Sequence, residues 1–371
     1  MFIRSLTLRN ILSFREPGPL ELKPLNIFIG ANASGKSNLI DCIELLQSLP
    51  NSVNNYINTR GGAEAWIWKG AKGARAARLA CEFQLQTVPL MYEMEFRAVE
   101  RTLVIEKEAL PPFLDRVLGG LHIREEASQD PAGSGIGGSD SVLAAWRNPA
   151  DRTPITRTAR LFSNIRIYRG FRTGTNDDAR SGVSSSAPKH PLDEKGSNLA
   201  LVLQEMDFHN SLKKVTESLQ RLSDRFEDIK IRGEGGRSQL YVQERGIGPV
   251  SATRLSDGTL KFLCLMAILL DHDPPPLVCI EEPECGLHPD ALRLVADALR
   301  EASSRMQIIV TTHSDALVDR FSDEPESIVV CERDFDESTC FKRLPSDQLK
   351  EWLAEYTLGD LWRRGEIGGT Q

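Results

Sequence analysis

The sequence predicts an α/β fold in which mixed β-sheets are flanked by helices and carry a mobile middle insertion. The first observation is a series of segments before residue 105 that alternate apolar and polar residues with a period of two, as β-strands do. The second is a glycine-rich loop at 30–38, which lies between an apolar run and a helix-period pattern. The third is a pair of apolar runs, 276–284 and 308–317, which predict strands with polar side chains at their ends.

Three regions are predicted along the 371 residues. Residues 1–105 form a first half around the glycine-rich loop, residues 106–206 form an insertion, and residues 207–371 form the second half of the same domain. Within the insertion, the stretches 127–141 and 172–198 are rich in Gly, Ser, Asp and Pro. Such stretches cannot build a core, so mobile loops are expected there.

Each half has its own predicted elements. In the first half, one helix interrupts the period-two segments FIRSLTLRN, LNIFI, RLACEFQL, YEMEFRAV and TLVIEK. In the second half, a helix is predicted from about Asp207 to Phe226, because apolar residues recur three or four apart on one face. A hairpin is predicted in EDIKIRGEGGRSQLYVQE, where Gly233, Gly235 and Gly236 are turn signals.

Composition and charge limit the class of protein. The longest apolar run, Phe262 to Leu270, is too short to span a bilayer, and the first ten residues predict a strand rather than a signal peptide. A soluble cytoplasmic protein without a membrane partner is therefore expected. The seven cysteines contain no C-x-x-C pair, which predicts reduced and mostly buried thiols. The net charge of −7 argues against a uniformly basic nucleic-acid binder.

Basic residues nevertheless gather in two places. Seven arginines and one acidic residue lie between Arg147 and Arg172. This stripe could meet DNA phosphates, an acidic partner or a nucleotide, and it could equally be a solvated face that pairs with acids elsewhere in the fold. A smaller basic cluster contains Lys69, Lys72, Arg75 and Arg78.

The glycine-rich loop has the composition of a nucleotide-binding loop. In GANASGKSN a lysine and a serine follow the second glycine directly, and the loop joins a predicted strand to a predicted helix. Backbone N–H groups of such a loop can surround phosphates, and the helix that begins near Lys36 adds the positive end of its dipole. Lys36 is expected to neutralise the β- and γ-phosphates, and Ser37 to place its hydroxyl on Mg²⁺. The residues expected to bind ATP are Gly30, Ala31, Asn32, Ala33, Ser34, Gly35, Lys36, Ser37 and Asn38.

Three later segments follow the loop in a set order. LSDGT, which contains Ser256, Asp257 and Gly258, opens an apolar helix, the strand in PLVCIEEPE ends in Glu281 and Glu282, and the strand in IIVTTHSDAL ends at a histidine. With LTLRNILSF, EEPECGLHP, TTHS and YTLGDLW, these segments resemble those of ATP-binding-cassette heads of the SMC/RecF-like branch. The chain resembles most closely the short prokaryotic ATPases related to the OLD family. The resemblance covers nearly the whole chain, apart from the middle loops.

The resemblance implies a dimer that encloses ATP. Ser256, Asp257 and Gly258 are expected to bind the γ-phosphate side of a nucleotide that a second protomer holds, so that two ATP molecules lie in a head-to-tail homodimer.

The resemblance also implies roles for the residues at the two strand ends. Glu281 is expected to reach Mg²⁺ directly or through water, and Glu282 to orient and deprotonate the attacking water. His313 is expected to contact the γ-phosphate and to report its loss. The structural alternatives are a pair of acids at a helix start and a hydrogen-bonded core histidine.

Several positions depart from the resembled pattern. Glu281 stands where most relatives have Asp, so the carboxylate is one methylene longer. Asp257 replaces the usual first signature glycine and brings a negative charge near phosphate, which calls for a compensating cation between protomers. His288 stands where SMC heads place an aspartate, and the Q-loop glutamine could be Gln84, Gln86 or neither. Slow turnover is expected from these departures.

The leading hypothesis is an ATP-driven dimeric switch that acts on DNA or on a separately encoded effector, such as a TOPRIM-type nuclease. Analogy with the resembled families places such a switch in phage defence or DNA repair. No TOPRIM domain is expected within the chain, because CERDFDE at 331–337 predicts a strand and a turn. Two alternatives stay open, namely a RecF-like repair ATPase that binds DNA directly and a nucleotide-gated scaffold with little hydrolysis.

Overall fold

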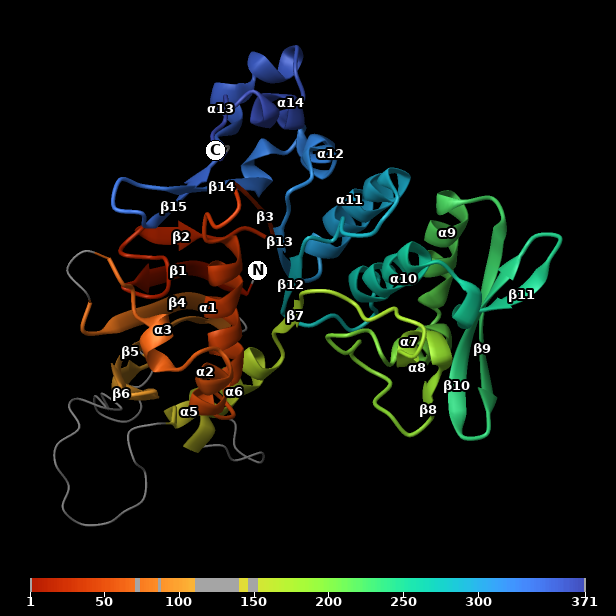
Figure 1. The fold of residues 1–371 in the computed structure, drawn as a ribbon, viewed down its shortest axis with the longest axis horizontal. Coiled ribbons are helices and arrows are strands. Elements are labelled where there is room, and N and C mark those ends of the chain that lie inside the picture. The colour runs from red at the N-terminus through yellow and green to blue at the C-terminus, as the bar shows by residue number, and fades with distance from the viewer. Residues whose placement is uncertain (1, 71–73, 86–87, 111–139, 146–152, 370–371) are drawn as a thin grey trace. The chain divides into compact units, whose positions relative to one another are not determined.

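The chain forms two compact units, and neither is continuous in sequence (Figure 1). The computed structural model describes residues 2–70, 74–85, 88–110, 140–145 and 153–369. The first unit contains residues 1–165, 326–344 and 365–371, and the second contains residues 166–325 and 345–364.

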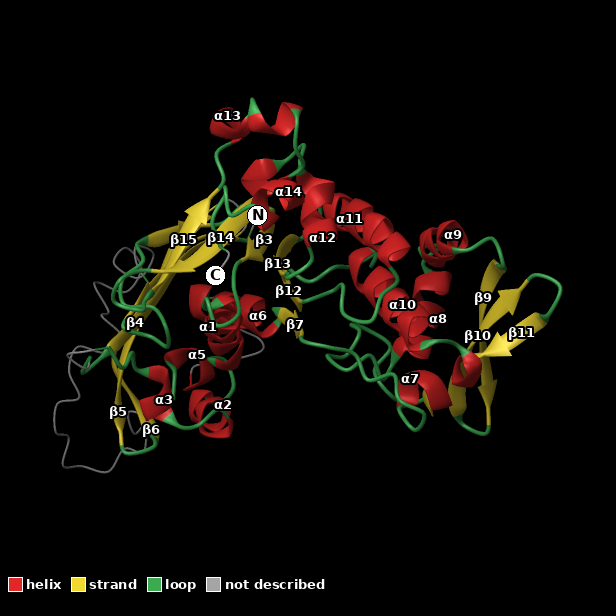
Figure 2. Ribbon diagram, turned by 45° about the horizontal axis from the view of Figure 1, so that its top comes forward, coloured by secondary structure: helices red, strands yellow, loops and turns green. Residues whose placement is uncertain are grey.

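The first unit contains an antiparallel sheet in the order β2-β1-β4-β5-β6, whose strands are drawn in yellow in Figure 2. The predicted alternation is present, as in β4, where Leu79, Cys81 and Phe83 are buried and Glu82 is exposed. All five predicted period-two segments of this half are strands, and four of them belong to this sheet. The strands are β1 (Ile3–Arg9), β2 (Pro19–Glu21), β4 (Ala77–Leu85), β5 (Val88–Val99) and β6 (Thr102–Ala109).

A second group of strands in the first unit brings distant parts of the chain together. All five side chains of β3 (Leu25–Ile29) are buried, so this strand is a continuous apolar run, as is usual for a parallel strand covered on both faces. β3 pairs in parallel with β14 (Ile328–Arg333), which pairs antiparallel with β15 (Thr339–Arg343). The helices among the described residues of this unit are α1 (Lys36–Ser48), α2 (Val53–Thr59), α3 (Ala63–Trp66), α5 (Val142–Ala145) and α6 (Pro154–Ser163).

The second unit contains three parallel strands and a separate antiparallel sheet. β12 (Leu277–Glu281) pairs in parallel with both β7 (Arg166–Tyr168) and β13 (Gln307–Thr311), so the C-terminal ends of the three strands lie at one edge. The antiparallel sheet contains β8 (Val183–Ser184), β9 (Phe226–Glu234), β10 (Arg237–Glu244) and β11 (Gly248–Ser251). The helices are α7 (Asp178–Ser181), α8 (Leu199–Phe208), α9 (Leu212–Leu222), α10 (Asp257–Leu269), α11 (Pro289–Ser303), α12 (Asp315–Val318), α13 (Ser346–Leu349) and α14 (Leu358–Arg363).

The predicted helix from Asp207 to Phe226 is wrong in its boundaries. Helix α8 ends at Phe208, Asn210 takes a positive φ of 59° that interrupts the helical path, and α9 begins only at Leu212. Phe226 is the first residue of β9. The predicted apolar face is correct within α9, where the buried residues are Leu212, Val215 and Leu219.

The stretch 172–198 is more structured than the sequence predicts. It is mainly loop, but it contains α7 and β8, and Ala179, Val183 and Leu192 are buried. The Asn198 side chain donates hydrogen bonds to the carbonyls of Pro188 and Pro191, each at 2.9 Å. Polar side chains therefore satisfy the backbone of this loop while its few apolar residues reach a core. In the other predicted loop, residues 127–139 lie outside the described residues.

Two smaller predictions are confirmed. The hairpin joins β9 to β10 through Gly235 and Gly236, whose φ angles are 57° and 75°. CERDFDE ends β14 and continues into a turn, in which the Asp334 carboxylate accepts from the backbone N–H groups of Asp336 and Ser338, each at 2.9 Å.

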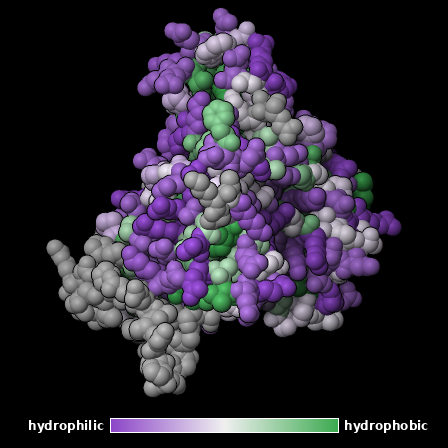
Figure 3. Space-filling model, turned by 60° about the vertical axis from the view of Figure 1, so that its left-hand side comes forward, coloured by the Kyte–Doolittle hydropathy of each residue, from purple (hydrophilic) through white to green (hydrophobic). Residues whose placement is uncertain are grey.

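The cysteine thiols are mostly buried, as the sequence predicts. Five of the seven cysteines are buried, Cys340 is half-buried and Cys285 is exposed. Hydrophilic residues dominate the coloured surface in the view of Figure 3, and the hydrophobic ones form small groups. Among the described helices, none combines the length and the apolar character that crossing a bilayer requires.

The closing segment YTLGDLW shows why its residue types are needed. Thr357 caps α14, and its side chain and that of Asp360 form a reciprocal capping box. Leu358 and Leu361 are buried, and the N–H of Gly359 donates to Asp319 Oδ1 at 2.7 Å. A Cβ atom at residue 359 would collide with the Asp319 carboxylate and would lie 2.7 Å from the carbonyl oxygen of Asp315. α14 therefore docks against α12 at a distance that only glycine permits.

Replacing Gly359 with Ala is expected to lower the free energy of unfolding by about 1 to 3 kcal/mol because of this collision. Helix propensity alone would favour Ala by about 1 kcal/mol, so the sign of the change is diagnostic. Denaturant unfolding measures it. The control is Gly233→Ala, where the carbonyl oxygen of Arg237 lies 4.0 Å from an added Cβ, and an equal loss in both variants would contradict the explanation.

Candidate nucleotide-binding site

The predicted nucleotide loop joins the end of β3 to the start of α1, and two of its glycines have positive φ angles. Gly30 has a φ of 151°, and Gly35, the N-cap of α1, has a φ of 103°. Gly35 has no side chain that could cap the helix, so no side chain at the N-cap covers the first N–H groups of α1. α1 begins at Lys36, as the sequence predicts.

Lys36 is folded back onto the loop. Its side chain is buried, with 6% of the residue exposed, and Nζ donates to the carbonyls of Gly30 at 2.7 Å and Ala31 at 2.8 Å. Ser34 Oγ lies 3.4 Å from the same nitrogen. The ammonium group is thus held at the centre of the loop by carbonyl oxygens. A phosphate can replace these oxygens with a full negative charge.

Side chains of β14 and β15 hold the loop from outside, and the sequence analysis missed them. Arg333 donates to the carbonyl of Ala33 through Nε at 3.0 Å and Nη2 at 2.7 Å. Thr339 Oγ1 donates to the carbonyl of Ser34 at 2.9 Å and lies 2.8 Å from Ser13 Oγ. Nothing in the local pattern indicates these residues, because they lie some 300 positions away along the chain.

The second unit places the predicted carboxylates at the shared end of its parallel strands. Glu281 is the last residue of β12, and Arg169 follows the last residue of the neighbouring β7. Arg169 Nη1 donates to Glu281 Oε1 at 2.5 Å, and both side chains are largely buried. The carboxylate proposed for Mg²⁺ therefore already has a cationic partner within its own unit.

Glu282 has a strained backbone, which is typical of functional sites. Its φ is 46°, a region that non-glycine residues rarely adopt. Its carboxylate accepts from the Cys285 thiol at 3.1 Å and lies 3.7 Å from His313 Nε2. Partial burial and the hydrogen bond to Glu282 raise the pKa of Cys285 to about 11, so the thiol keeps its proton at neutral pH.

Glu284 is a further residue of this group that the sequence analysis did not single out. Its Oε1 accepts from the Thr312 hydroxyl at 2.7 Å and from the backbone N–H of His313 at 2.8 Å. The carboxylate thereby ties the loop after β12 to the loop after β13 and positions His313 beside Glu282. The available signal was the third carboxylate of EEPE, two residues after the predicted pair.

The signature residues form the N-terminus of α10. Ser256 is the N-cap, and its Oγ accepts from the backbone N–H of Thr259 at 3.1 Å. A Cβ at Gly258 would lie 2.9 Å from the carbonyl of Gly286, so this glycine allows the segment after β12 to approach closely. Ser256 and Gly258 line a hollow of about 270 Å³ together with His288, which is the N-cap of α11.

The charge of Asp257 is balanced within the chain. Arg180 Nη2 donates to Asp257 Oδ1 at 2.5 Å, and the same guanidinium donates to the carbonyls of Thr173 and Leu255. The expectation that a cation from the other protomer must compensate Asp257 is therefore not needed, because a buried arginine of the same chain does so. The sequence gives no sign of this partner, which lies 77 positions earlier.

Two other predictions have clear structural outcomes. The arginine stripe spans both units, since Arg157 belongs to the first and Arg169 belongs to the second and pairs with Glu281, while Arg147 lies outside the described residues. Gln84 lies on β4 and accepts from Arg4 at 3.1 Å, while Gln86 lies outside the described residues.

The structure brings the predicted residues together in two groups. Glu281 and Glu282 line a hollow of about 320 Å³ with Arg169 and Lys261, and His313 lies beside Glu282. The loop at 30–38 belongs to the first unit. Ser37 supplies a hydroxyl in the first unit and Glu281 a carboxylate in the second, and each is a ligand type with which proteins hold Mg²⁺ beside nucleotide phosphates. The ion would supply charge neutralisation on the phosphates.

The fold and the loop define a P-loop ATPase domain with the α/β architecture of SMC heads. Residues 25–73 and 137–319, more than half of the chain, match the family described as "AAA domain, putative AbiEii toxin, Type IV TA system". The chain belongs to this family and is therefore a nucleotide-binding P-loop protein.

Solved structures support the fold. An SMC head bound to the C-winged helix domain of ScpA is similar, with a TM-score of 0.61 and 16% identity over 94% of this chain and 99% of that one. A Pyrococcus furiosus SMC head domain with an extended coiled coil, bound to the C-terminal domain of ScpA, has a TM-score of 0.59 and 15% identity over 95% and 99%. A Pyrococcus yayanosii SMC head domain with a coiled coil and joint has a TM-score of 0.53 and 13% identity over 95% and 99%. At these identities the likeness concerns the fold alone. No curated protein matches the sequence.

Replacing Gly35 with Ala is expected to lower the free energy of unfolding by about 2 to 4 kcal/mol, because the residue has a positive φ and the added Cβ would collide with Thr339 Oγ1. Nucleotide binding is expected to be lost as well. The control, Gly236→Ala, has a positive φ but no atom within 4 Å of the added Cβ, so it is expected to cost only about 1 kcal/mol. Denaturant unfolding measures the loss of stability, and titration with a fluorescent ATP analogue measures the loss of nucleotide binding. Equal losses in both variants would contradict the role of the close contact between Gly35 and Thr339.

Replacing Arg169 with Leu is expected to lower the Mg²⁺ concentration needed for half-maximal nucleotide binding on the order of tenfold, because the guanidinium competes with the cation for Glu281. The measurement is nucleotide affinity across a Mg²⁺ titration, which does not depend on turnover. Arg172→Leu is the matched control, since Arg172 is exposed and lies in the same segment. A higher Mg²⁺ requirement in Arg169→Leu would show that the arginine instead holds Glu281 in place for the ion.

Proposed function

We propose that this protein is an ATP-driven dimeric switch in which two chains enclose two ATP molecules and hydrolysis separates them. Residues 30–38 of one protomer would hold the phosphates, and the N-terminus of α10 from the other protomer would contact the γ-phosphate. Ser37 and Glu281 are the proposed Mg²⁺ ligands, Glu282 the proposed base, and His313 the proposed contact to the γ-phosphate.

The observation that carries the proposal is the exposed start of α10. Ser256 and Asp257 are exposed, although they lie at the N-terminus of a 13-residue helix in which every residue from Thr259 to Leu269 except Lys261 is buried. The positive end of such a helix attracts a phosphate, and a close approach is possible at Gly258 because it has no side chain. An exposed anion site of this kind, in a chain with its own phosphate loop, is what a head-to-tail dimer requires.

The geometry around Glu282 supports hydrolysis. A carboxylate on a strained residue, placed beside a histidine and fixed by neighbouring hydrogen bonds, suits a general base because its position is set before substrate binds. Glu284 contributes by fixing the loop that carries His313. The arrangement favours a slow enzyme. One oxygen of Glu282 already accepts a hydrogen bond from the Cys285 thiol, and one oxygen of Glu281 accepts one from Arg169.

The proposed biological role is in defence against phage, through a separately encoded effector such as a TOPRIM-type nuclease or through DNA. The description of the family names a putative toxin and a type IV toxin–antitoxin system. Two of the similar SMC heads were solved bound to a domain of another protein, ScpA. Both facts support a head that passes a nucleotide-dependent change to a partner.

A second candidate function is a nucleotide-gated scaffold that binds ATP and hydrolyses very little. The specific observation in its favour is that Glu281, Glu282 and Asp257 all have partners within the chain. In this case ATP binding alone would drive the dimer, and an effector would read the closed state.

ATP hydrolysis and molar mass in ATP, measured for the wild type, Lys36→Ala and Glu282→Gln, test the proposal. Lys36→Ala is expected to lose nucleotide binding and dimerisation, because it removes the cation at the centre of the loop. Glu282→Gln is expected to lose turnover by about 100-fold or more while remaining a dimer, because binding persists without the base. Hydrolysis is followed by phosphate release and molar mass by light scattering.

Lys213→Ala and Glu217→Gln, two exposed positions on α9, serve as controls for the same changes in charge. A monomeric Glu282→Gln protein in saturating ATP would refute the ATP-enclosing dimer. A wild type that dimerises in ATP without measurable phosphate release would instead establish the nucleotide-gated scaffold.

A further inference from the structure

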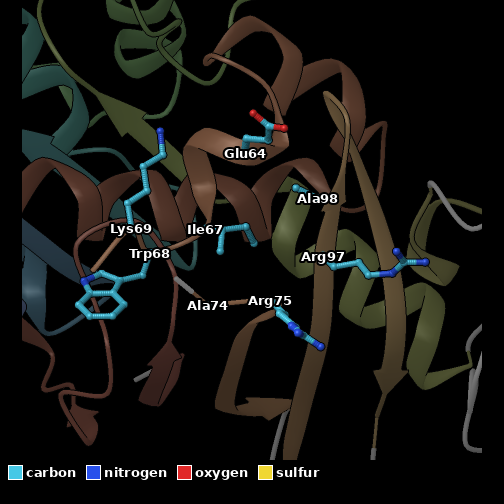
Figure 4. Close-up of a pocket in the computed structure, with 8 residues that line it drawn as sticks. All are labelled: Glu64, Ile67, Trp68, Lys69, Ala74, Arg75, Arg97 and Ala98. Carbon is cyan, nitrogen blue, oxygen red and sulfur yellow. The ribbon is translucent and has the colours of Figure 1, made fainter. Parts of the chain in front are cut away.

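The first unit contains a large hollow that is separate from the loop at 30–38. It has a volume of about 600 Å³, within the range of small-ligand sites, and is lined by eight residues from the α3–β4 segment and from β5 (Figure 4). We call it the basic hollow and define it by Trp68, Lys69, Arg75 and Arg97, with Glu64 and Ile67. Three of these side chains are cationic and one is anionic, in a chain whose net charge is −7.

Trp68 presents an aromatic surface in a fixed position. Its backbone N–H donates to the carbonyl of Asn10 at 2.9 Å. A Cβ at Gly70 would overlap the indole ring, so the ring lies against a backbone position that only glycine can supply. The guanidinium carbon of Arg15 lies 5.8 Å from the ring centroid. Trp68 is half-buried and contributes to the lining of the hollow.

Two cations of the basic hollow have no counter-ion among the described residues. The side chains of Lys69 and Arg75 are exposed and make no ion pair or hydrogen bond to any part of the chain that the structure describes. Figure 4 shows them extending in different directions from the same stretch of chain, while Arg97 comes from β5. Arg97 pairs with Glu106 at 2.7 Å, and both of these side chains are about half exposed. Such exposed pairs are weak, so Arg97 can turn to a stronger anion.

Two further basic residues lie on other strands of the same sheet. Arg9 and Arg78 are cross-strand neighbours on β1 and β4. Arg78 pairs with Glu93 at 2.9 Å, and Arg9 lies 3.6 Å from Glu16. Like charges on opposed strand positions repel each other, so an anion near this end of the sheet would stabilise it. Of the basic cluster noted in the sequence, Lys72 lies outside the described residues.

We propose that the basic hollow binds single-stranded nucleic acid, with a base against Trp68 and phosphates at Lys69 and Arg75. An aromatic side chain next to flexible, unpaired cations is the combination with which proteins hold single strands, because every base has a face that stacks and every nucleotide has a phosphate. A volume of about 600 Å³ accommodates a nucleotide unit.

A single strand fits these residues better than a duplex or an acidic peptide. In a duplex the bases are stacked on each other and cannot reach an indole that lies in a hollow. An acidic peptide would use Lys69 and Arg75 but would leave Trp68 without a planar partner. Binding at this hollow does not require the proposed ATP-driven dimer, and it would supply that switch with a nucleic-acid partner of defined class.

The test is fluorescence anisotropy with labelled oligonucleotides of about 12 nucleotides, a length typical of such sites, at about 50 mM salt. Oligo-dT and oligo-U distinguish DNA from RNA, and a duplex of equal length and poly-glutamate are the competitors. Lys69→Glu/Arg75→Glu is expected to weaken binding of the preferred strand by more than about tenfold. It should also reduce the slope of log affinity against log salt by about 1.4, since two phosphate contacts are lost.

Trp68 is tested separately, because its role is to stack. Trp68→Ala is expected to weaken binding by about tenfold with little change in the salt slope, and Trp68→Phe is expected to retain most of the affinity. A merely structural role of the tryptophan would lower thermal stability in both variants, which melting curves of the same samples detect.

Lys213→Glu/Lys230→Glu is the matched control, because it makes the same change in net charge at exposed positions of the second unit. Equal loss in the two double variants, no strand binding by the wild type, or equally tight binding of duplex or poly-glutamate would each overturn the proposal. Lys36→Ala separates the two functions, since it is expected to bind the single strand like the wild type while failing to bind ATP.

Discussion

The close packing of the loop at 30–38 against β14 and β15 is the constraint on which the proposed nucleotide site depends. Two glycines make this packing possible, since a Cβ at Gly30 would collide with the carbonyl of Cys331 and one at Gly35 with Thr339. The loop keeps its shape because Arg333 and Thr339 bind its carbonyl oxygens. The proposed phosphate ligands are the first N–H groups of α1, which no side chain of Gly35 covers. A loop that carries only the correct glycine and lysine spacing would lack this support.

Charge balance within the chain is the second organising feature. Glu281 is paired with Arg169, Asp257 with Arg180, and Glu284 with the hydroxyl and backbone N–H of the segment that carries His313. Carboxylates gathered at one edge of a sheet would otherwise repel each other. In the proposed function, Mg²⁺ and phosphate would compete with these partners from the same chain, and the free energy of this exchange would separate the nucleotide-free state from the nucleotide-bound state. A switch needs such a difference, because a ligand shifts an equilibrium only through its unequal affinity for the two states.

The fold was largely predictable, and the exceptions have physical reasons. The strands of the first unit and the start of α1 follow from periodicity and from the strand, loop and helix order. The boundaries around α9 were not predictable from periodicity, because the break depends on the left-handed backbone of Asn210 rather than on a proline or glycine. The stretch 172–198 is polar by composition, yet side chains such as Asn198 satisfy its backbone and allow Leu192 to be buried. Single-residue hydrogen bonds of this kind leave no periodic signal.

The sequence by itself determined the α/β class, the nucleotide loop and the order of the segments with Ser256, Glu281, Glu282 and His313, because each depends on residues that are neighbours in the chain. Only the tertiary structure decided which side chains stand beside them. Arg333 and Thr339 reach the nucleotide loop, Arg169 and Arg180 neutralise Glu281 and Asp257, and Trp68, Lys69, Arg75 and Arg97 line one hollow. Apart from the nearby Trp68, Lys69 and Arg75, these contacts join residues far apart along the chain, where strand pairing and packing, rather than local pattern, bring charged side chains together.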